Sequence, residues 1–322
     1  MQQHPARRKI KMFSMAIMIS LLLPSFAQAW EAATHAYIEE HLFKGQGLSD
    51  ENLMNNRIYG ANTIDVFNNN FSQPYLSFQF YLHDPAQENF MKVWDLADTA
   101  TQKAFAYGFV GHNNSWGMDY TAHISGITLG RDQGYVIAKA GQLAALLGPM
   151  LESPEINLSL PENVLLDICH YLVESGVDLL VRDLAPGIGD RLMTAAYFRS
   201  DEIPALLTEA YAAEFADLAG GEAMAAQMIL TSESAFRTNM MAYGWALSQD
   251  NALELIAGGL ARQATDYFAM LGLPPVAEEI LTEVAKQGIS AAMAICDKDF
   301  QVELRATTGW VNGNLSSAGV AW

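Results

Sequence analysis

Histidine is confined to one half of this chain. Seven histidines are present, and six of them follow residue 29: His35, His41, His83, His112, His123 and His170. Imidazole is a common ligand of transition metals, and His170 lies four positions before Glu174, which places both side chains on one face of a helix. This pair could hold one cation, although such pairs also occur as ordinary solvated pairs. His41, on the same predicted helix as His35, is interpreted as a surface histidine.

A second set of residues has a similar spacing. His112, Asp119 and His123 are separated by seven and four positions, which would place them within a stripe of about 40° on a continuous helix. Gly117 falls within this segment and weakens the assumption that it is helical. Because a stripe of imidazole and carboxylate is a poor face for an apolar core, its simplest use is to bind cations.

The composition indicates a folded, acidic protein. The 322 residues include 36 acidic and 18 basic side chains, a net charge of -18, and 51% of them are hydrophobic. Such a chain has enough apolar surface to build a core. The acidic balance disfavours a nucleic-acid binder that relies on basic patches. It does not exclude a nuclease whose positive charge is supplied by metal ions.

The first 29 residues differ from the rest. Arg7, Arg8, Lys9 and Lys11 precede an apolar stretch, and residues 27–29 read Ala-Gln-Ala. This order is typical of a secretory signal peptide cleaved before Trp30, and an uncleaved membrane anchor is the less favoured alternative. Removal of four basic side chains would leave 14 basic and 36 acidic ones, a charge of -22. We therefore expect a secreted or periplasmic protein, soluble or peripheral to a membrane.

Apolar spacing near 3.6 predicts an all-α protein, with residues 30–322 forming a single mainly helical domain. The histidine-bearing half is about 30–184, and about 185–322 contributes additional helices. The helices are expected at 34–44, 88–109, 134–151, 162–184, 188–199, 204–218, 222–246, 251–271 and 276–299.

Two stretches depart from this helical pattern. Residues 59–87, rich in Asn, Gln, Pro and aromatic rings, are expected to form an irregular loop region, and residues 305–322 a short hairpin or a loosely held tail. The two cysteines, Cys169 and Cys296, could form one disulfide or remain two buried thiols.

One ordered set of residues resembles a known family. The set is Trp30, His35, Asp65, His83, His112, Asp119, His123 and His170-x-x-x-Glu174. It resembles the zinc-dependent phospholipase C superfamily, which includes the N-terminal domain of glycosylphosphatidylinositol-specific phospholipase D and, more distantly, the single-strand-specific zinc nucleases. The resemblance covers roughly residues 30–178. It implies an all-α multi-helix domain of the phospholipase C and zinc nuclease type that holds three zinc ions.

The resemblance also implies a role for each of these residues. Asp65, His83, His112 and Asp119 would hold a first zinc, and Asp119 would bridge to a second. That second ion would be held by His35 and by the free amine and carbonyl oxygen of a mature N-terminal Trp30. The third, more open ion would be held by three side chains: His123, His170 and Glu174.

The chemistry implied by this resemblance is hydrolysis of a phosphodiester. Zinc lowers the pKa of a bound water from about 15.7 towards 7 and stabilises the charge that builds on a phosphodiester. Asp65 would be the catalytic carboxylate that orients or deprotonates the attacking water. Phe80 matches an aromatic residue of the family's choline-binding box and would contact substrate, whereas Val66 stands where that box has tyrosine. The interval from His112 to Asp119 is about one helical turn longer than in the best-known bacterial enzymes.

The function expected from the sequence is therefore an exported, zinc-dependent phosphodiesterase of phospholipase C type, acting on a phospholipid or a related phosphodiester. Peripheral contact with a membrane would accompany such a substrate. Nucleic acid is disfavoured as a partner, and no protein partner is implied. Two alternatives remain: a zinc-dependent nuclease or nucleotidase, and a non-catalytic helical zinc-binding protein of the periplasm.

Overall fold

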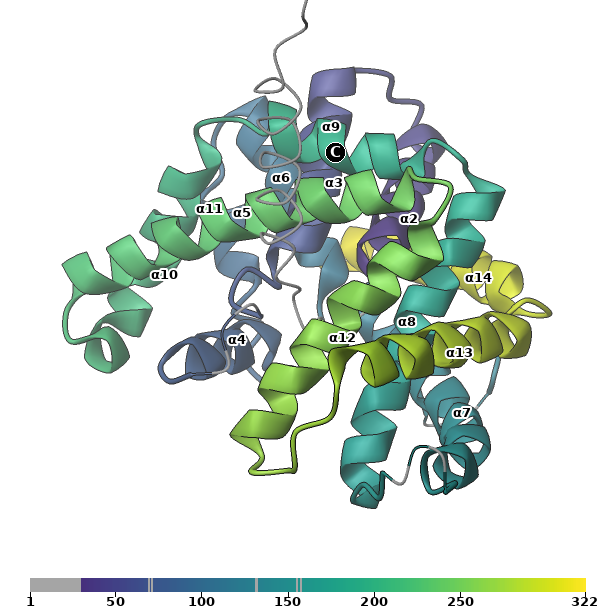
Figure 1. Ribbon diagram of the computed structural model, residues 1–322. Coiled ribbons are helices and arrows are strands. Elements are labelled where there is room, and N and C mark those ends of the chain that lie inside the picture. The colour runs from purple at the N-terminus through teal and green to yellow at the C-terminus, as the bar shows by residue number, and fades with distance from the viewer. Residues whose placement is uncertain (1–29, 69, 71, 131–132, 155, 157) are drawn as a thin grey trace, which may run out of the picture.

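The computed structural model describes residues 30–68, 70, 72–130, 133–154, 156 and 158–322, and these residues form a helical assembly (Figure 1). No β-strand occurs among them, so the all-α prediction is confirmed. The proposed signal peptide, residues 1–29, lies outside the described residues. Within the described part of the chain, no helix combines the length and the hydropathy that crossing a membrane requires.

The elements follow one another along the chain in this order: α2 (Ala32–Gly45), α3 (Glu51–Thr63), α4 (Tyr75–His83), α5 (Met91–Leu96), α6 (Ala100–His112), the π-helical turn η1 (Tyr120–Ile124), α7 (Tyr135–Leu151), α8 (Glu162–Leu184), α9 (Ile188–Phe198), α10 (Ile203–Ala219), α11 (Glu222–Leu247), α12 (Ala252–Met270), α13 (Glu278–Cys296) and α14 (Phe300–Ser317). In Figure 1, α8 runs behind α12 and α13, and α7 lies beside it.

Two glycines allow α3 and α6 to pack closely. A Cβ atom at Gly60 would lie 2.0 Å from the carbonyl oxygen of Phe105, and one at Gly108 would lie 2.0 Å from that of Arg57. Only glycine permits such a close approach of two backbones. The approach brings the carboxyl end of α6 against α3, where the Nδ1 atom of His112 lies 2.7 Å from the carbonyl oxygen of Ala61.

A buried carboxylate fixes α2 against α8. Asp178 of α8 accepts hydrogen bonds from the backbone N–H groups of Ala33 and Thr34, both at 2.8 Å, and from the Thr34 hydroxyl at 2.7 Å. The first N–H groups of a helix have no partner within the helix, so a carboxylate at this end accepts their hydrogen bonds. Its negative charge is also stabilised by the positive end of the helix dipole. The start of α2, which carries His35, is thereby held beside the helix that carries His170 and Glu174.

The prediction of an irregular region over residues 59–87 is wrong in part, because α3 ends at Thr63 and α4 occupies Tyr75–His83. The Asp50 side chain caps α3 by accepting from the N–H groups of Asn52 and Leu53. Several polar side chains of α3 are buried rather than exposed. This removes the amphipathic pattern by which a helix is recognised.

The prediction of a hairpin or loose tail over residues 305–322 is also wrong, because α14 extends to Ser317. Its buried face carries Leu304, Thr307, Val311 and Leu315 at helical spacing. The helix expected at 88–109 is two helices, α5 and α6, separated where Thr99 and Gln102 form a capping box at the start of α6.

The segment between His112 and His123 is not a continuous helix. The side-chain oxygen of Asn113 accepts from the N–H groups of Ser115, Trp116 and Gly117, which ends α6 in a turn before η1 begins. The two cysteines are free and buried, as in the second of the two interpretations of the sequence.

Candidate metal centre

The structure gathers the predicted side chains into three groups whose ligand atoms lie within 4.8 Å of one another. The first group is Asp65, His83 and His112; the second is His35, His112 and Asp119; and the third is His123, His170 and Glu174. Tetrahedral zinc with bonds of about 2.0 to 2.2 Å places its ligand atoms about 3.3 to 3.6 Å apart. Ligand atoms of one group that lie near this separation could therefore bind the same zinc ion.

The first group lies where α3, α4 and α6 end. The His83 Nε2 atom is 3.3 Å from Asp65 Oδ1, and the His112 Nε2 atom is 3.5 Å from Asp65 Oδ2. The second carboxylate, Asp119, lies just before η1, with its Oδ2 atom 2.8 Å from His112 Nε2 and 3.7 Å from His83 Nε2. Four side chains from four segments thus point at one small volume.

The second group shares Asp119 with the first. Its other oxygen, Oδ1, is 3.4 Å from the Nε2 atom of His35, whose ring stacks on that of His112 with centroids 4.2 Å apart. The two oxygens of Asp119 therefore face different imidazoles, an arrangement that suits a carboxylate bridging two cations.

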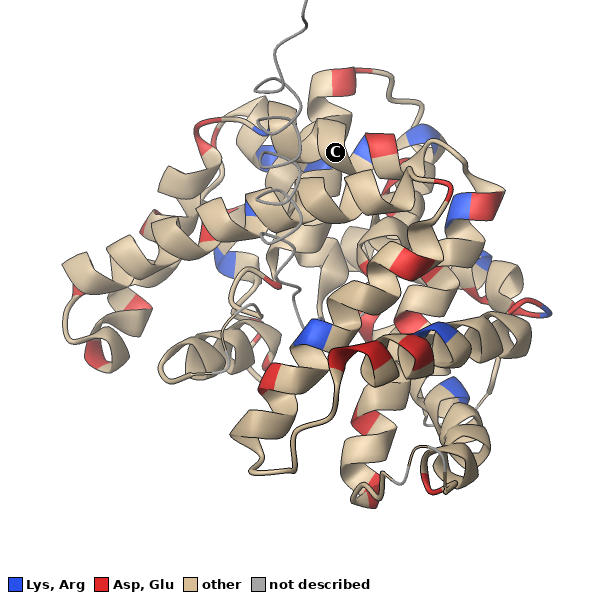
Figure 2. Cartoon of the chain, in the orientation of Figure 1, with Lys and Arg blue, Asp and Glu red and all other residues tan. Residues whose placement is uncertain are grey.

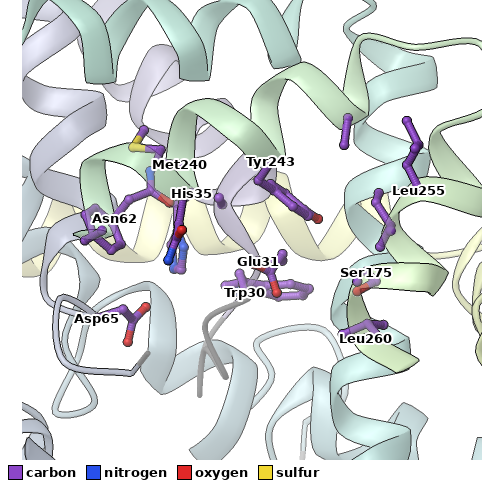
Figure 3. A pocket seen from close by; sticks show the side chains of 16 residues that line it. Trp30, Glu31, His35, Asn62, Asp65, Ser175, Met240, Tyr243, Leu255 and Leu260 are labelled. Atoms are coloured by element: carbon purple, nitrogen blue, oxygen red, sulfur yellow. The ribbon is translucent and has the colours of Figure 1, made fainter. Parts of the chain in front are cut away.

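Trp30 lies beside the second group and is fully buried. Its indole N–H donates to the Thr121 hydroxyl at 3.2 Å, and its ring lies against Tyr135 with centroids 5.3 Å apart. Figure 3 shows Trp30, His35 and Asp65 among the residues that line a cavity with about 870 Å³ of empty space. The side chain of Trp30 thus fixes the start of the described chain at the metal groups.

The third group joins η1 to α8. The His123 Nε2 atom is 3.0 Å from His170 Nε2 and 3.4 Å from Glu174 Oε1, and His170 Nε2 is 2.7 Å from the same oxygen. The side chains of His123 and His170 are 11% and 13% exposed, more than any ligand side chain of the first two groups. They line a second cleft, with about 1120 Å³ of empty space, at whose edge Phe80 is 61% exposed.

Five ligand atoms are buried without a hydrogen-bond partner among the described residues. They are the Nε2 atoms of His35 and His112, both carboxylate oxygens of Asp119, and the Oε2 atom of Glu174. Buried polar atoms are nearly always paired, because an unpaired one keeps the full cost of losing water. A bound cation would satisfy all five, so these residues fit a metal site.

The outer nitrogens of two imidazoles are paired with backbone carbonyls. The Nδ1 atom of His112 lies 2.7 Å from the Ala61 oxygen, and that of His83 lies 3.0 Å from the Gln79 oxygen. At His112 this bond orients the ring and keeps the proton on Nδ1, which leaves Nε2 free for a metal. At His83 the Gln79 Nε2 atom also lies 2.8 Å from Nδ1, so the carbonyl and the amide together orient that ring.

The pKa shifts indicate a surplus of negative charge. Burial opposes ionisation of Asp119, but the facing His112 outweighs this effect and holds the pKa of Asp119 well below its usual range. Burial also opposes protonation of His112, yet Asp119 and Asp65 raise its pKa to about 9. Burial lowers the pKa of His35 and that of His123 to about 4, so both are neutral ligands at pH 7. Divalent cations would balance the remaining carboxylate charge.

Three polar side chains at the site were missed from the sequence. Asn68 and Gln79 both donate to Asp65 Oδ1, at 2.6 and 3.1 Å. Their spacing, three after Asp65 and four before His83, is the only signal for them in the chain. Asp178 continues the four-residue spacing of His170 and Glu174 along α8, which would have placed it on the same helix face.

One of the six histidines lies apart from the three groups. His41 is exposed, with its Nδ1 atom 2.7 Å from the Tyr37 carbonyl oxygen, as expected for a surface histidine.

Comparisons of the chain with models of known protein families, with curated proteins and with solved structures found no match. A function for this chain is therefore inferred from its residues and their geometry.

Proposed function

We propose that this protein is a zinc-dependent phosphodiesterase of phospholipase C type, exported after cleavage before Trp30. The observation that supports this most directly is the set of three adjoining His and carboxylate groups, with Asp119 shared between two of them. The charges of Asp119 and His112 both shift the pKa of His123, because the third group lies close to the other two. Together they fit a trinuclear centre.

Zinc is the metal that the donor set favours. Five imidazoles and three carboxylates contribute to the three groups. Calcium and magnesium prefer shells made of oxygen alone, whereas mixed nitrogen and oxygen donors suit zinc. The free amine and carbonyl oxygen of a mature Trp30 would complete the second group.

The chain's own residues divide the work of hydrolysis. Zinc bound here would supply Lewis acidity towards a phosphodiester and lower the pKa of a water ligand to about 7. Asp65, held by Asn68 and Gln79, is suited to orient the attacking water and accept its proton. The third group faces the open cleft and would bind the substrate phosphate.

The surroundings of the cleft favour a lipid over a nucleic acid. Three exposed apolar side chains line it: Phe80 at 61%, Ile124 at 48% and Met270 at 52%. A patch of this kind suits a lipid surface. The mature charge of -22 opposes a polyanion, and the Lys and Arg positions coloured along the chain in Figure 2 are scattered and do not gather in one stripe.

The test is a comparison of substrates with zinc-loaded mature protein. We expect release of diacylglycerol from phospholipid vesicles, loss of that activity with a chelator, and its recovery on addition of zinc. Glu174→Gln should abolish hydrolysis, whereas Glu162→Gln, an exposed residue of the same helix, should not. Release of mononucleotides from single-stranded DNA without lipid hydrolysis would support the nuclease alternative, and neither activity in the zinc-loaded protein would contradict catalysis.

A further inference from the structure

A second cavity, lined almost entirely by apolar side chains, lies between α8, α12 and α13. The volume open to the centre of a water-sized sphere is about 60 Å³, and the cavity is lined by Ile168 and Leu172 of α8, Ala264 and Phe268 of α12, and Leu281 and Val284 of α13. Several of these residues form a small hydrophobic cluster separate from the main core. A single water needs only about 10 to 15 Å³ by this measure, and well-packed interiors leave few larger voids, so this apolar space exceeds a packing defect and suits an apolar ligand.

This apolar cavity adjoins the cleft of the third metal group. Tyr171 and Tyr267 line both spaces. The ring of Tyr171 stacks on the imidazole of His170, with centroids 5.3 Å apart and an angle of 7° between the planes. The Tyr267 hydroxyl donates a hydrogen bond to Asp167 at 3.0 Å, which fixes the position of this second side chain between the two spaces. A molecule with a polar group at His170 could therefore extend an apolar portion into the cavity.

One amide group in the cavity has no partner. Gln263 lines the cavity and is 4% exposed, and neither its Nε2 nor its Oε1 atom has a hydrogen-bond partner among the described residues. An apolar pocket that carries one unpaired polar group is the usual form of a ligand site in which that group fixes the orientation. Gln263 lies one helical turn from Tyr267, about 6 Å along the axis. An acyl ester lies only a few bonds from the phosphate of a glycerolipid.

We propose that this cavity binds one acyl chain of a glycerophospholipid whose phosphate lies at the third metal group. The Gln263 amide donates a hydrogen bond to the ester carbonyl of that chain, and Tyr171 and Tyr267 form the passage between the two spaces. This inference rests on the proposed function and adds the substrate class: an acyl-ester lipid rather than a small soluble phosphodiester. The cavity, not the metal centre, then sets the preference for chain length.

The first test uses monomeric short-chain phosphatidylcholines of increasing acyl length. In the wild type, kcat/KM should rise about fourfold for each added methylene until the cavity is full. Ala264→Trp fills the cavity and should flatten this rise, with hydrolysis of chain-free p-nitrophenyl phosphorylcholine unchanged. Ala269→Trp, at an exposed position of the same helix, is the matched control and should keep the rise. A flat series in the wild type, or the same series in both tryptophan variants, would overturn the proposal while hydrolysis itself stands.

The second test examines the ester contact and the cavity separately. Gln263→Leu keeps the size of the side chain but removes the amide, so it should lose the preference for acyl-ester over alkyl-ether lipids. Retention of that preference would overturn the role of Gln263. Binding of 11-(dansylamino)undecanoic acid, followed by fluorescence, should occur in the wild type and in Ala269→Trp but not in Ala264→Trp. Because this binding needs no turnover, its failure is distinguishable from a failure of the proposed phosphodiesterase activity.

Discussion

Removal of metal should strongly destabilise the fold. Five buried ligand atoms have no hydrogen-bond partner among the described residues, and they belong to His35, His112, Asp119 and Glu174. Two of these atoms, His112 Nε2 and Asp119 Oδ2, lie 2.8 Å apart and stabilise each other when no cation is bound. Each of the other three costs about 1 to 3 kcal/mol, so together they cost about 3 to 9 kcal/mol without a cation. This is a large part of the free energy of unfolding of an ordinary domain, which is about 5 to 15 kcal/mol.

The stability lost on removal of metal should appear as a measurable fall in Tm. The entropy of unfolding is about 2.1 cal/mol/K per residue, so a chain of about 290 residues loses roughly 1.6 °C per kcal/mol, and the lower figure of about 3 kcal/mol corresponds to a fall of about 5 °C. Differential scanning calorimetry of the mature protein should show this fall in EDTA. Zinc should restore the Tm, and magnesium or calcium at the same concentration should not, because neither favours imidazole ligands.

Two variants make the experiment specific. His112→Ala removes a ligand common to two of the groups and should lower the Tm in zinc and weaken the response to EDTA. His41→Ala, at an exposed position, should behave as the wild type. A wild-type Tm that is the same in EDTA and in zinc would refute the reasoning, because the five atoms would then need no cation.

Three further outcomes are expected. His123→Ala should abolish phosphodiester hydrolysis with a much smaller loss of stability than His112→Ala, since its side chain faces the cleft; activity like that of the wild type would contradict its role. One extra residue before Trp30 should weaken the second zinc by turning the terminal amine into an amide, and an unchanged zinc content would argue against Trp30 as a ligand. Burial raises the pKa of Asp178 from 3.8 to about 6, so the contribution of this carboxyl group to the stability of the metal-free protein should rise by roughly 3 kcal/mol as the pH falls through 6 towards 4, while His35 and His123, with pKa values lowered to about 4, change stability in the opposite direction. Asp178→Asn should remove this gain in guanidinium titrations at several pH values, and an unaltered pH profile would contradict the shift.

The spacing of residues in the sequence predicted local pairs better than distant ones. His170 and Glu174 lie on one face of α8, as four-residue spacing requires, and their ligand atoms are 2.7 Å apart. By contrast, physical reasoning on the sequence could not bring Asp65 to His112, because the close packing of α3 on α6 depends on Gly60 and Gly108. In the sequence alone, a glycine only lowers the helix propensity of its segment, and its role in close packing is evident only when the partner helix is known.

Helix α3 was missed because its buried face is polar. Arg57 is fully buried and pairs with Glu39 of α2 and with Gln46, which lie more than ten residues away. A buried ion pair needs both partners in place, and one of them alone is indistinguishable from a surface charge in the sequence. The wrong loop prediction therefore reflects partners that only the folded chain supplies.

The interval from His112 to Asp119 shows a different limit. An added helical turn would have returned Asp119 to the face of His112, but the chain instead leaves the helix at Asn113 and returns through η1. The two side chains meet all the same, at 2.8 Å. The residues that meet here were named from the sequence, whereas the path of the chain between them depends on one side-chain turn.

The most direct test of the central claim is the metal content of the purified mature protein. Elemental analysis after exhaustive dialysis should find three zinc ions per chain, one for each His and carboxylate group, and a lower content in His112→Ala but not in His41→Ala. Absence of zinc from the wild type after equilibration with the metal, or the same content in all three proteins, would contradict the account.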